Sequence, residues 1–230
     1  MVLFRIQLSC DFSGYSEMAI ATAGLFGFRL PWNFDAPMLA RNMADYWRRW
    51  HITLAAWFRD YVYLRLPFRK QGWSVYRNLA ITMALVGLWH GAGWSFVTWG
   101  LAQGFGLILL IALRRNHIEL RMPMVAAFAI TFTYGTLCIS FFRAGSVGKA
   151  IGMITGSLGL KDVGEESLGW RAWLAIALLS ALHIAWRRWT LGERLLRLPF
   201  TAQALLYGAT AAVTLALMPY LAQPFYYFQF

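Results

Sequence analysis

One apolar stretch, from Leu79 to Leu113, constrains this chain more than any other feature of its sequence. It contains no Asp, Glu, Lys or Arg, and its main interruptions are His90 and the glycine step Gly91–Gly93. About 20 apolar helical residues cross a hydrocarbon core that is roughly 30 Å thick. The stretch can therefore form one broken, tilted helix or a tight pair of helices, because glycine is tolerated at membrane depth where backbone packs against protein or lines a cavity.

The composition agrees with a membrane protein. Of the 230 residues, 59% are hydrophobic and only 13% are charged, whereas a soluble fold has charges at roughly a quarter of its positions. Disorder is excluded by the same numbers. The net charge of +11 does not indicate nucleic-acid binding, because the arginines lie between apolar runs, where such clusters mark cytoplasmic loops and anionic lipid headgroups.

Further segments are apolar over a length that can cross a bilayer. With the first stretch they predict an all-α, polytopic transmembrane helical bundle, forming a single membrane domain over residues 1–230. The N-terminus lacks a charged leader followed by a cleavage site, so insertion is expected to rely on these internal spans. The three transmembrane helices expected within 122–222 are Met122–Phe142, Trp170–Trp186 and Ala202–Ala222.

Loop charges orient the spans, because cytoplasmic loops carry an excess of Lys and Arg. Basic residues concentrate at 41–77, 114–121 and 187–197, which we assign to the cytoplasm. The loop 143–171 mixes both signs with Gly and Ser and suits the outer face. This assignment returns the region 79–113 to its starting side, which favours the helical pair.

Residues 11–70 differ in kind, since they mix aromatic and charged residues too densely to span lipid and are too apolar for a solvated loop. We expect interfacial and re-entrant helices here. Asp45 can pair with Arg48 or Arg49 across one helical turn. Large apolar residues recur at helical spacing from Asn42 to Tyr61, which predicts one amphipathic helix; they are Trp47, Trp50, Leu54, Trp57, Phe58 and Tyr61.

His90 is the main candidate for chemistry, because an ionisable side chain inside an apolar stretch is a functional hypothesis by default. The alternative is a histidine that packs against a neighbouring helix through one hydrogen bond. Glycines nearby allow close approach of backbone or substrate, and a desolvated, neutral imidazole suits a general base. Rigid amphipathic indoles are expected to wall this site, namely Trp89, Trp94 and Trp99.

His51 is the second candidate, on the predicted amphipathic helix. Taken alone it is as well explained as an interfacial histidine with one exposed nitrogen. His117 and His183 lie in or beside charged loops and carry no such signal. No histidine pair has i, i+4 spacing, and neither cysteine has metal-ligand spacing, so we predict no metal site. Nucleophile-elbow, Walker and dinucleotide motifs are also absent from the sequence.

Four motifs occur in one order, and together they resemble the bacterial alginate O-acetyltransferase branch of the membrane-bound O-acyltransferase family. That branch also includes the D-alanyl transfer protein of teichoic acid synthesis. The ending Pro224–Phe230 is similar to the terminus of that branch as well. The motifs are Asp-Phe-Ser-Gly-Tyr-Ser-Glu-Met at 11–18, Trp-Arg-Arg-Trp-His-Ile-Thr at 47–53, Trp-Phe-Arg-Asp-Tyr-Val-Tyr at 57–63 and Gly-Leu-Trp-His-Gly-Ala-Gly-Trp at 87–94.

The resemblance implies that His90 is the catalytic histidine and that His51 is the second residue needed for activity. It implies transfer of an acyl group, most simply acetyl, from a cytoplasmic thioester such as acetyl-coenzyme A, with no bound cofactor. The implied acceptor is a hydroxyl of an exported polysaccharide such as alginate, or an accessory acetyl-transfer protein in the periplasm. The implied location is the bacterial inner membrane, in a multi-pass arrangement with the lipid bilayer as partner.

On this basis His90 is expected to act as general base, and His51 to orient the donor or stabilise the oxyanion. Arg48 or Arg49 is expected to receive phosphates of the donor. Further candidates for contact with substrate or donor are Trp47, Trp89, Trp94 and Asp60, although Asp60, beside Arg59, suits holding its helix better than chemistry.

Two departures from the family pattern bear on this expectation. The resemblance implies a substantial membrane portion ahead of the first motif, so we expect an N-terminally truncated member whose pocket lacks walls. Where the family has a Pro-Leu-Gly-Gly turn after Tyr63, this chain reads Leu64–Lys70, which implies a different docking surface. A transporter or channel subunit that uses a buried histidine as a proton relay is the alternative function, and a purely structural membrane subunit is the third.

Overall fold

The computed structural model describes residues 1–67, 72–160, 169–170, 173–174, 177–178, 181, 195 and 197–216. These residues form helices and their connections, and none of them belongs to a β-strand. The all-α fold predicted from the sequence is confirmed. Contacts divide the chain into two units, residues 1–167 and 168–229, which we describe separately. The single membrane domain over 1–230 stays a prediction.

The first unit is organised around an antiparallel helical pair. Helix α4 (Ser74–His90) and helix α5 (Trp94–Arg115) are joined by the tight turn Gly91–Gly93. The close approach depends on glycine, since a Cβ at Gly100 would fall on the main-chain carbonyl of Met83. The helical pair expected for residues 79–113 is therefore correct, and the single broken helix is excluded.

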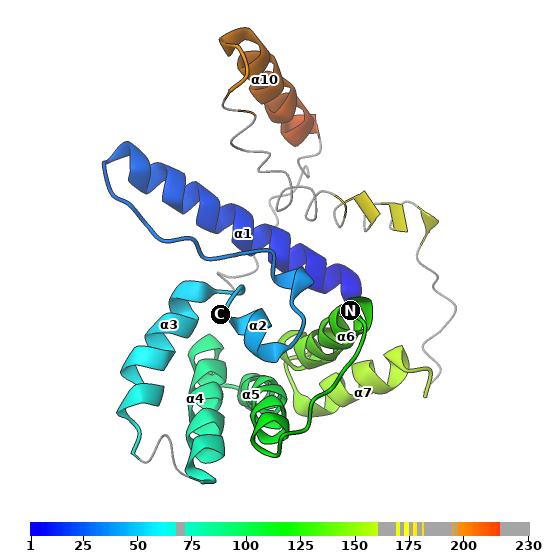
Figure 1. Cartoon of the computed structure of the whole chain (residues 1–230). Helices are drawn as coiled ribbons and strands as arrows, with labels where there is room; N and C mark the ends of the chain where they lie inside the picture. The colour runs from blue at the N-terminus through cyan, green and yellow to red at the C-terminus, as the bar shows by residue number, and fades with distance from the viewer. Residues whose placement is uncertain are drawn as a thin grey trace. The chain divides into compact units, whose positions relative to one another are not determined.

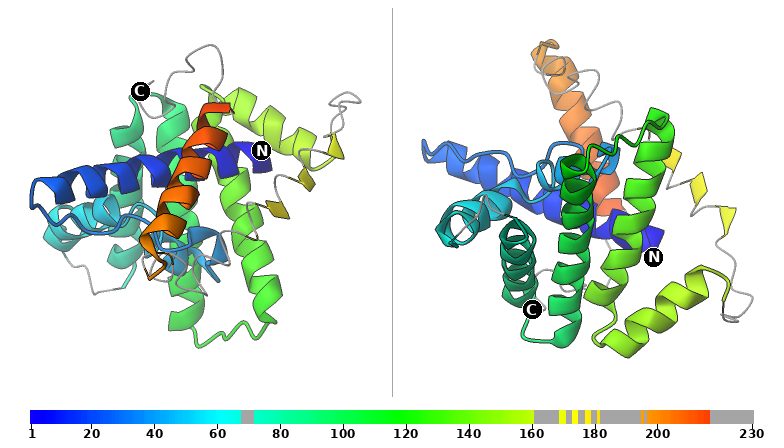
Figure 2. Two further views of the ribbon diagram at one scale, coloured as in Figure 1. Left: turned by 90° about the horizontal axis from the view of Figure 1, so that it is seen from above. Right: turned by 60° about the horizontal axis from the view of Figure 1, so that its bottom comes forward.

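Helix α6 (Met124–Arg143) lies beside α5, and helix α7 (Val147–Ser157) packs against α6. Figure 1 shows α3 to α6 in a row, and the right-hand view of Figure 2 shows α5 and α6 side by side. Both α5 and α6 are long and apolar enough to cross a membrane. The predicted span Met122–Phe142 matches α6 closely, and the unit is a membrane helical bundle.

Helix α1 (Val2–Leu25) docks on α6 through a buried arginine. Arg5 is 3% exposed, and its Nη1 donates to Thr136 Oγ1 at 3.0 Å and to the main-chain carbonyl of Phe132. Its guanidinium also lies 4.6 Å from the ring centroid of Phe132 and 5.4 Å from that of Tyr46. Gly135 makes room for this contact, because a Cβ there would come within 2.7 Å of Arg5 Nη1. The sequence had not singled out Arg5.

The single amphipathic helix predicted from Asn42 to Tyr61 is wrong. The 3-10 turn η1 (Pro37–Leu39) is followed by two short helices, α2 (Met43–Trp47) and α3 (Ile52–Tyr61), with the 3-10 turn η2 (Tyr63–Arg65) after them.

The break in that predicted helix lies at His51, which adopts a left-handed conformation with φ 46°. Helix α3 begins where Asn33 satisfies its free amides. The Ile52 N–H donates to the Asn33 carbonyl at 3.0 Å, and the Thr53 N–H donates to Asn33 Oδ1 at 3.2 Å. An unpaired amide in the first turn of a helix needs such an acceptor, and here it comes from a distant segment.

In the second unit the structure describes one long helix, α10 (Phe200–Ala216), which is apolar. It overlaps the first part of the span predicted at Ala202–Ala222, and residues 217–222 lie outside the described residues. Most of the span predicted at Trp170–Trp186 also lies outside them, as do His183 and the ending Pro224–Phe230.

Candidate functional site

His90 is the last residue of α4 and is enclosed by aromatic rings from the bundle. Its side chain is 5% exposed. Its ring centroid lies 5.1 Å from that of Trp99 on α5 and 5.2 Å from that of Phe142 on α6, both edge-on. Trp89 lies 4.8 Å away on the same helix. The imidazole therefore sits at the meeting of three helices, inside protein.

His51 lies at the break between α2 and α3 and is also buried, with 8% exposed. Its Nδ1 is 3.3 Å from Asn33 Oδ1, and its ring meets Phe12 of α1 edge-on at 4.6 Å. Its Nε2 has no hydrogen-bond partner among the described residues. The left-handed backbone at His51 turns this side chain towards α1 instead of leaving it on the face of one continuous helix.

The indole of Trp89 contacts the rings of both histidines. Trp89 lies 6.0 Å from the ring of His51 and 4.8 Å from that of His90. Trp47 adds a second connection, because its ring lies 6.2 Å from Trp99, which contacts His90. The fold thus brings together His51, His90, Trp47 and Trp89, four of the residues predicted from the sequence.

The remaining predicted residues lie elsewhere. Trp94 begins α5 and its side chain is 80% exposed. Asp60 forms an exposed ion pair with neighbouring Arg59 at 2.7 Å.

Arg49 is mostly buried and is bound by Asp45 at 2.8 Å and Asp35 at 3.2 Å. Arg48 is exposed and forms a longer ion pair with Asp45, at 3.8 Å. Of the two arginines proposed for phosphate binding, Arg49 is thus engaged in holding α2.

Asp45 is the centre of that arginine cluster, and the pairing expected from its spacing is confirmed. Its carboxylate accepts from the Arg41 N–H at 3.0 Å and from Arg49 Nε at 2.8 Å. Burial acts to raise the pKa of Asp45, but these hydrogen bonds and the arginine charges outweigh it and hold the pKa below its usual value.

Asp45→Asn is expected to lower the stability of the first unit by roughly 1.5 kcal/mol at neutral pH, the contribution of a hydrogen bond to a charged group. A group with a lowered folded-state pKa stabilises the fold above its unfolded pKa, and this is lost as the pH falls through the folded value. The wild-type melting temperature should therefore approach that of the variant as the pH is lowered from about 5. Asp60→Asn, which breaks an exposed pair, should change little.

An apolar cavity of about 320 Å³ leads towards the histidines. Its lining includes Val86, one helical turn before His90, and Trp47, whose ring contacts Trp99. At its other end Arg114 supplies a positive charge. The cavity therefore runs between α2, α3, α4 and α5, from the end of α5 towards the aromatic cluster.

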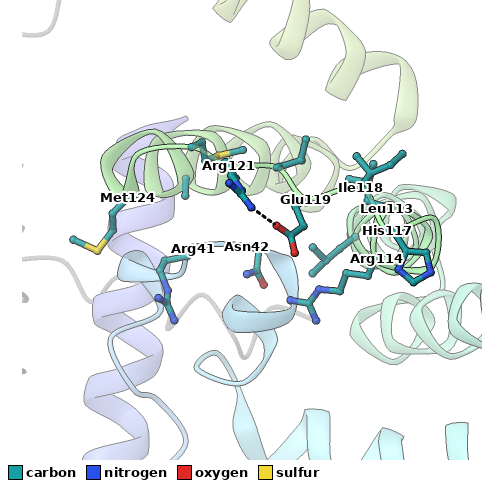
Figure 3. A pocket seen from close by; sticks show the side chains of 13 residues that line it. Arg41, Asn42, Leu113, Arg114, His117, Ile118, Glu119, Arg121 and Met124 are labelled. Atoms are coloured by element: carbon teal, nitrogen blue, oxygen red, sulfur yellow. Dashed lines mark hydrogen bonds and ion pairs between the residues drawn. The ribbon is translucent and has the colours of Figure 1, made fainter.

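A larger cavity of about 740 Å³ lies at the end of α5 and the start of α6. It shares Leu110 and Arg114 with the apolar cavity. Figure 3 shows Arg41, Arg114 and Arg121 around it, with Arg121 paired to Glu119 at 3.3 Å. Three arginines and one carboxylate, Glu119, line this cavity, and the remaining excess of positive charge suits an anion.

Several buried polar atoms of the bundle carry no hydrogen bond among the described residues, and sequence reasoning missed two of the residues concerned, Gln103 and Ser140. Trp47 Nε1, Trp99 Nε1, Gln103 Oε1 and Ser140 Oγ have no hydrogen-bond partner among the described residues. Such atoms are costly to bury without water or ligand. Gln103 could have been found, because it is the one amide side chain in the stretch 79–113. Asn33 carried no comparable signal.

Comparison with known proteins agrees with this architecture. The model of the membrane-bound O-acyltransferase family matches residues 1–145. A peptidoglycan O-acetyltransferase from Helicobacter pylori is 41% identical over 165 residues, which is 70% of this chain and 31% of that protein. A probable alginate O-acetylase from Azotobacter vinelandii is 47% identical over 112 residues, 48% of this chain and 22% of the relative.

A teichoic acid D-alanyltransferase from Streptococcus thermophilus is 37% identical over 117 residues, 47% of this chain and 28% of the relative. The matched part of the chain spans less than a third of the length of each of these relatives. The family match nevertheless covers more than half of the chain and includes α1 to α6, which carry both histidines. This chain belongs to the membrane-bound O-acyltransferase family.

Proposed function

We propose that this chain carries the catalytic core of an O-acyltransferase of the bacterial inner membrane, a multi-pass protein that moves an acetyl group from a cytoplasmic thioester to a hydroxyl of an exported polysaccharide. The observation that carries the proposal is the burial of His90 among rings of three helices, one turn beyond the end of an apolar cavity. Relatives named for O-acetyl and D-alanyl transfer support the class of reaction.

His90 takes the role of general base in this proposal. The imidazole accepts the proton of the attacking hydroxyl, whose oxygen bonds to the thioester carbonyl carbon. The carbon–sulfur bond then breaks, an ester forms, and the proton passes to the departing thiolate, so that the imidazole is neutral again. Rings of Trp99 and Phe142 exclude water from this reaction. His51, across Trp89, orients a reactant.

The two cavities supply a route for the donor. Arg114 lines both, and along α5 it lies about 22 Å from Trp99 at 1.5 Å per residue. A thioester on a long flexible arm, such as acetyl-coenzyme A, would place its phosphates among Arg41, Arg114 and Arg121 and its apolar arm in the smaller cavity. Arg41 and Arg121 are also paired, with Asp45 at 3.8 Å and Glu119 at 3.3 Å, but both are exposed. Arg49 is mostly buried between Asp35 and Asp45, so the proposed phosphate site lies away from it.

Arg114→Gln is expected to raise the KM for the thioester donor roughly tenfold with a smaller change in kcat. A lost charge-assisted hydrogen bond costs about 1.4 kcal/mol or more, which corresponds to that factor. Initial rates across donor concentrations would measure it. Arg65→Gln is the matched control, because Arg65 is exposed and lines neither cavity. An unchanged KM in the Arg114 variant would contradict the proposed route.

The acceptor is proposed to be a polysaccharide hydroxyl, alginate being one example, or a periplasmic acetyl-transfer protein. The test of the whole function uses sealed membrane vesicles that contain the full-length protein. Radiolabelled acetyl-coenzyme A supplied on the cytoplasmic side should label polysaccharide or protein on the other side, and labelling should require the protein. Proton or solute flux without acetyl transfer would instead identify a transporter.

A further inference from the structure

Asn33 lies in the segment between α1 and η1, and its buried side chain reaches three segments of the first unit. It is 9% exposed. Its Oδ1 lies 3.2 Å from the Thr53 N, 2.9 Å from Thr53 Oγ1 and 3.3 Å from His51 Nδ1. Its Nδ2 donates to Ser16 Oγ of α1 at 3.2 Å. One amide therefore links α1, the start of α3 and a candidate catalytic ring.

The partners of Asn33 determine which amide atom is the oxygen. A main-chain N–H can only donate, so the atom that faces the Thr53 N–H must be the acceptor Oδ1. An amide oxygen cannot donate, so His51 Nδ1 must carry the proton in their contact. In a neutral imidazole the other nitrogen is then an acceptor. Burial lowers the pKa of His51 to about 4, so the ring is neutral at pH 7.

We propose that Asn33 is a positioning residue that fixes His51 in one ring orientation and in the Nδ1–H tautomer, leaving Nε2 as a hydrogen-bond acceptor that orients the acceptor substrate through a hydroxyl other than the one His90 deprotonates. The inference rests on the proposed acyl transfer. It also excludes oxyanion stabilisation as the role of His51, because an unprotonated Nε2 cannot donate a hydrogen bond to an oxyanion. Nε2 is buried and has no partner among the described residues, as expected for an acceptor that a substrate hydroxyl completes.

The backbone supports the same assignment. His51 is held in the left-handed region at φ 46° by bonds on its C-terminal side, where the Ile52 N–H donates to the Asn33 carbonyl. A non-glycine residue in this region costs free energy and persists where surrounding contacts enforce it. Asn33 therefore constrains the backbone beside His51 through its main chain and the ring through its side chain.

Nitrogen-15 NMR of histidine-labelled full-length protein in lipid tests the tautomer directly. The His51 signals, assigned by their loss in His51→Ala, should be those of a neutral ring with Nδ1 protonated. In Asn33→Leu, which keeps the size and removes the acceptor, the Nε2–H form should appear. An Nε2–H ring in the wild type, or no change in Asn33→Leu, would overturn the proposal whether or not acyl transfer is observed.

Kinetic measurements on the same variants test whether the loss of the Asn33 contact lowers the rate of acyl transfer. Asn33→Leu should lower kcat by roughly 10- to 100-fold, the range found when a group that orients a histidine is removed, with the donor KM changed less than about threefold. Asn33→Asp keeps the acceptor oxygen and should retain activity within about tenfold of wild type. Ser16→Ala removes only the partner of Nδ2 and is the matched control.

A combined variant separates positioning from a general structural role. Asn33→Leu added to His51→Ala should cause no further loss of kcat, since residues that act through one another are not additive. If the two losses multiply, Asn33 acts independently of His51 and the proposal is wrong. Should Asn33→Leu fail to fold, Asn33→Asp decides: a loss equal to that of His51→Ala would contradict the proposal. Absence of acyl transfer by the wild type would refute the proposed function and leave the NMR result to decide on Asn33.

Discussion

Replacing His90 by alanine is expected to lower the rate of acyl transfer by roughly 10²- to 10⁴-fold, the usual contribution of a positioned general base. The reason is that the imidazole is buried where α4, α5 and α6 meet, so bulk water cannot take over proton removal. The effect should fall on kcat, because the proposed site of the donor phosphates is the larger, basic cavity, whose lining does not include His90. Radiolabelled transfer by purified protein in lipid would measure it.

His90→Gln is the matched companion of that experiment. Glutamine fills much of the same space and can hydrogen-bond, but it cannot accept a proton at neutral pH. Both variants should therefore show a similar loss of activity, and the melting temperature of His90→Gln, which leaves little empty space, should stay close to that of the wild type. Activity near wild type in either variant would end the assignment of His90 as the base. A loss of activity accompanied by unfolding of both would count only as evidence that His90 supports the packing of Trp99 and Phe142.

The helical pair could be predicted from the sequence because the features that define it lie within or directly beside residues 79–113. Apolar length, glycine at 91 and 93, and basic loops on both sides of 79–113 limit that region to few arrangements. Helix α6 was predicted for the same reason. In each case the bilayer thickness gives the length of the element, and the residues that end it are charged, as Arg115 and Arg143 are.

The break at His51 could not be predicted from the same kind of pattern. Apolar spacing continues through residues 47–58, so periodicity indicates one helix. What interrupts it is Asn33, which lies 20 residues before Thr53 and binds its main chain. Arg5 is a similar case, because its partner Thr136 is separated from it by 131 residues. Buried polar side chains whose partners are remote give no periodic signal.

Resemblance to a family singled out His51 and His90, but it did not predict that both rings are buried and contact the same indole. Their connection through Trp89 depends on the turn at His51 and on the end of α4. Trp94 was expected to wall the site because it is four residues from His90 in the sequence, but the turn at Gly91–Gly93 directs it outwards. Nearness in sequence is a poor guide across a tight turn.

Gly100→Ala is expected to destabilise the first unit by about 3 kcal/mol, at the upper end of the cost of overpacking a well-packed interior. The added Cβ would fall on the Met83 carbonyl and within about 3.0 Å of the Gly87 nitrogen, all of them backbone atoms of α4 that cannot rotate away. The two helices would have to separate. Thermal unfolding in detergent and in lipid, followed by circular dichroism, would measure the loss.

Gly152→Ala provides the control, since Gly152 lies inside α7 and a Cβ there meets nothing within 4 Å. That change should be neutral or stabilising by up to about 1 kcal/mol, because alanine favours the helix. If both variants are equally stable, the close contact of α4 with α5 does not hold the bundle together. If only Gly100→Ala is destabilised, it should also lose acyl transfer, because the α4–α5 contact is what holds His90 against Trp99.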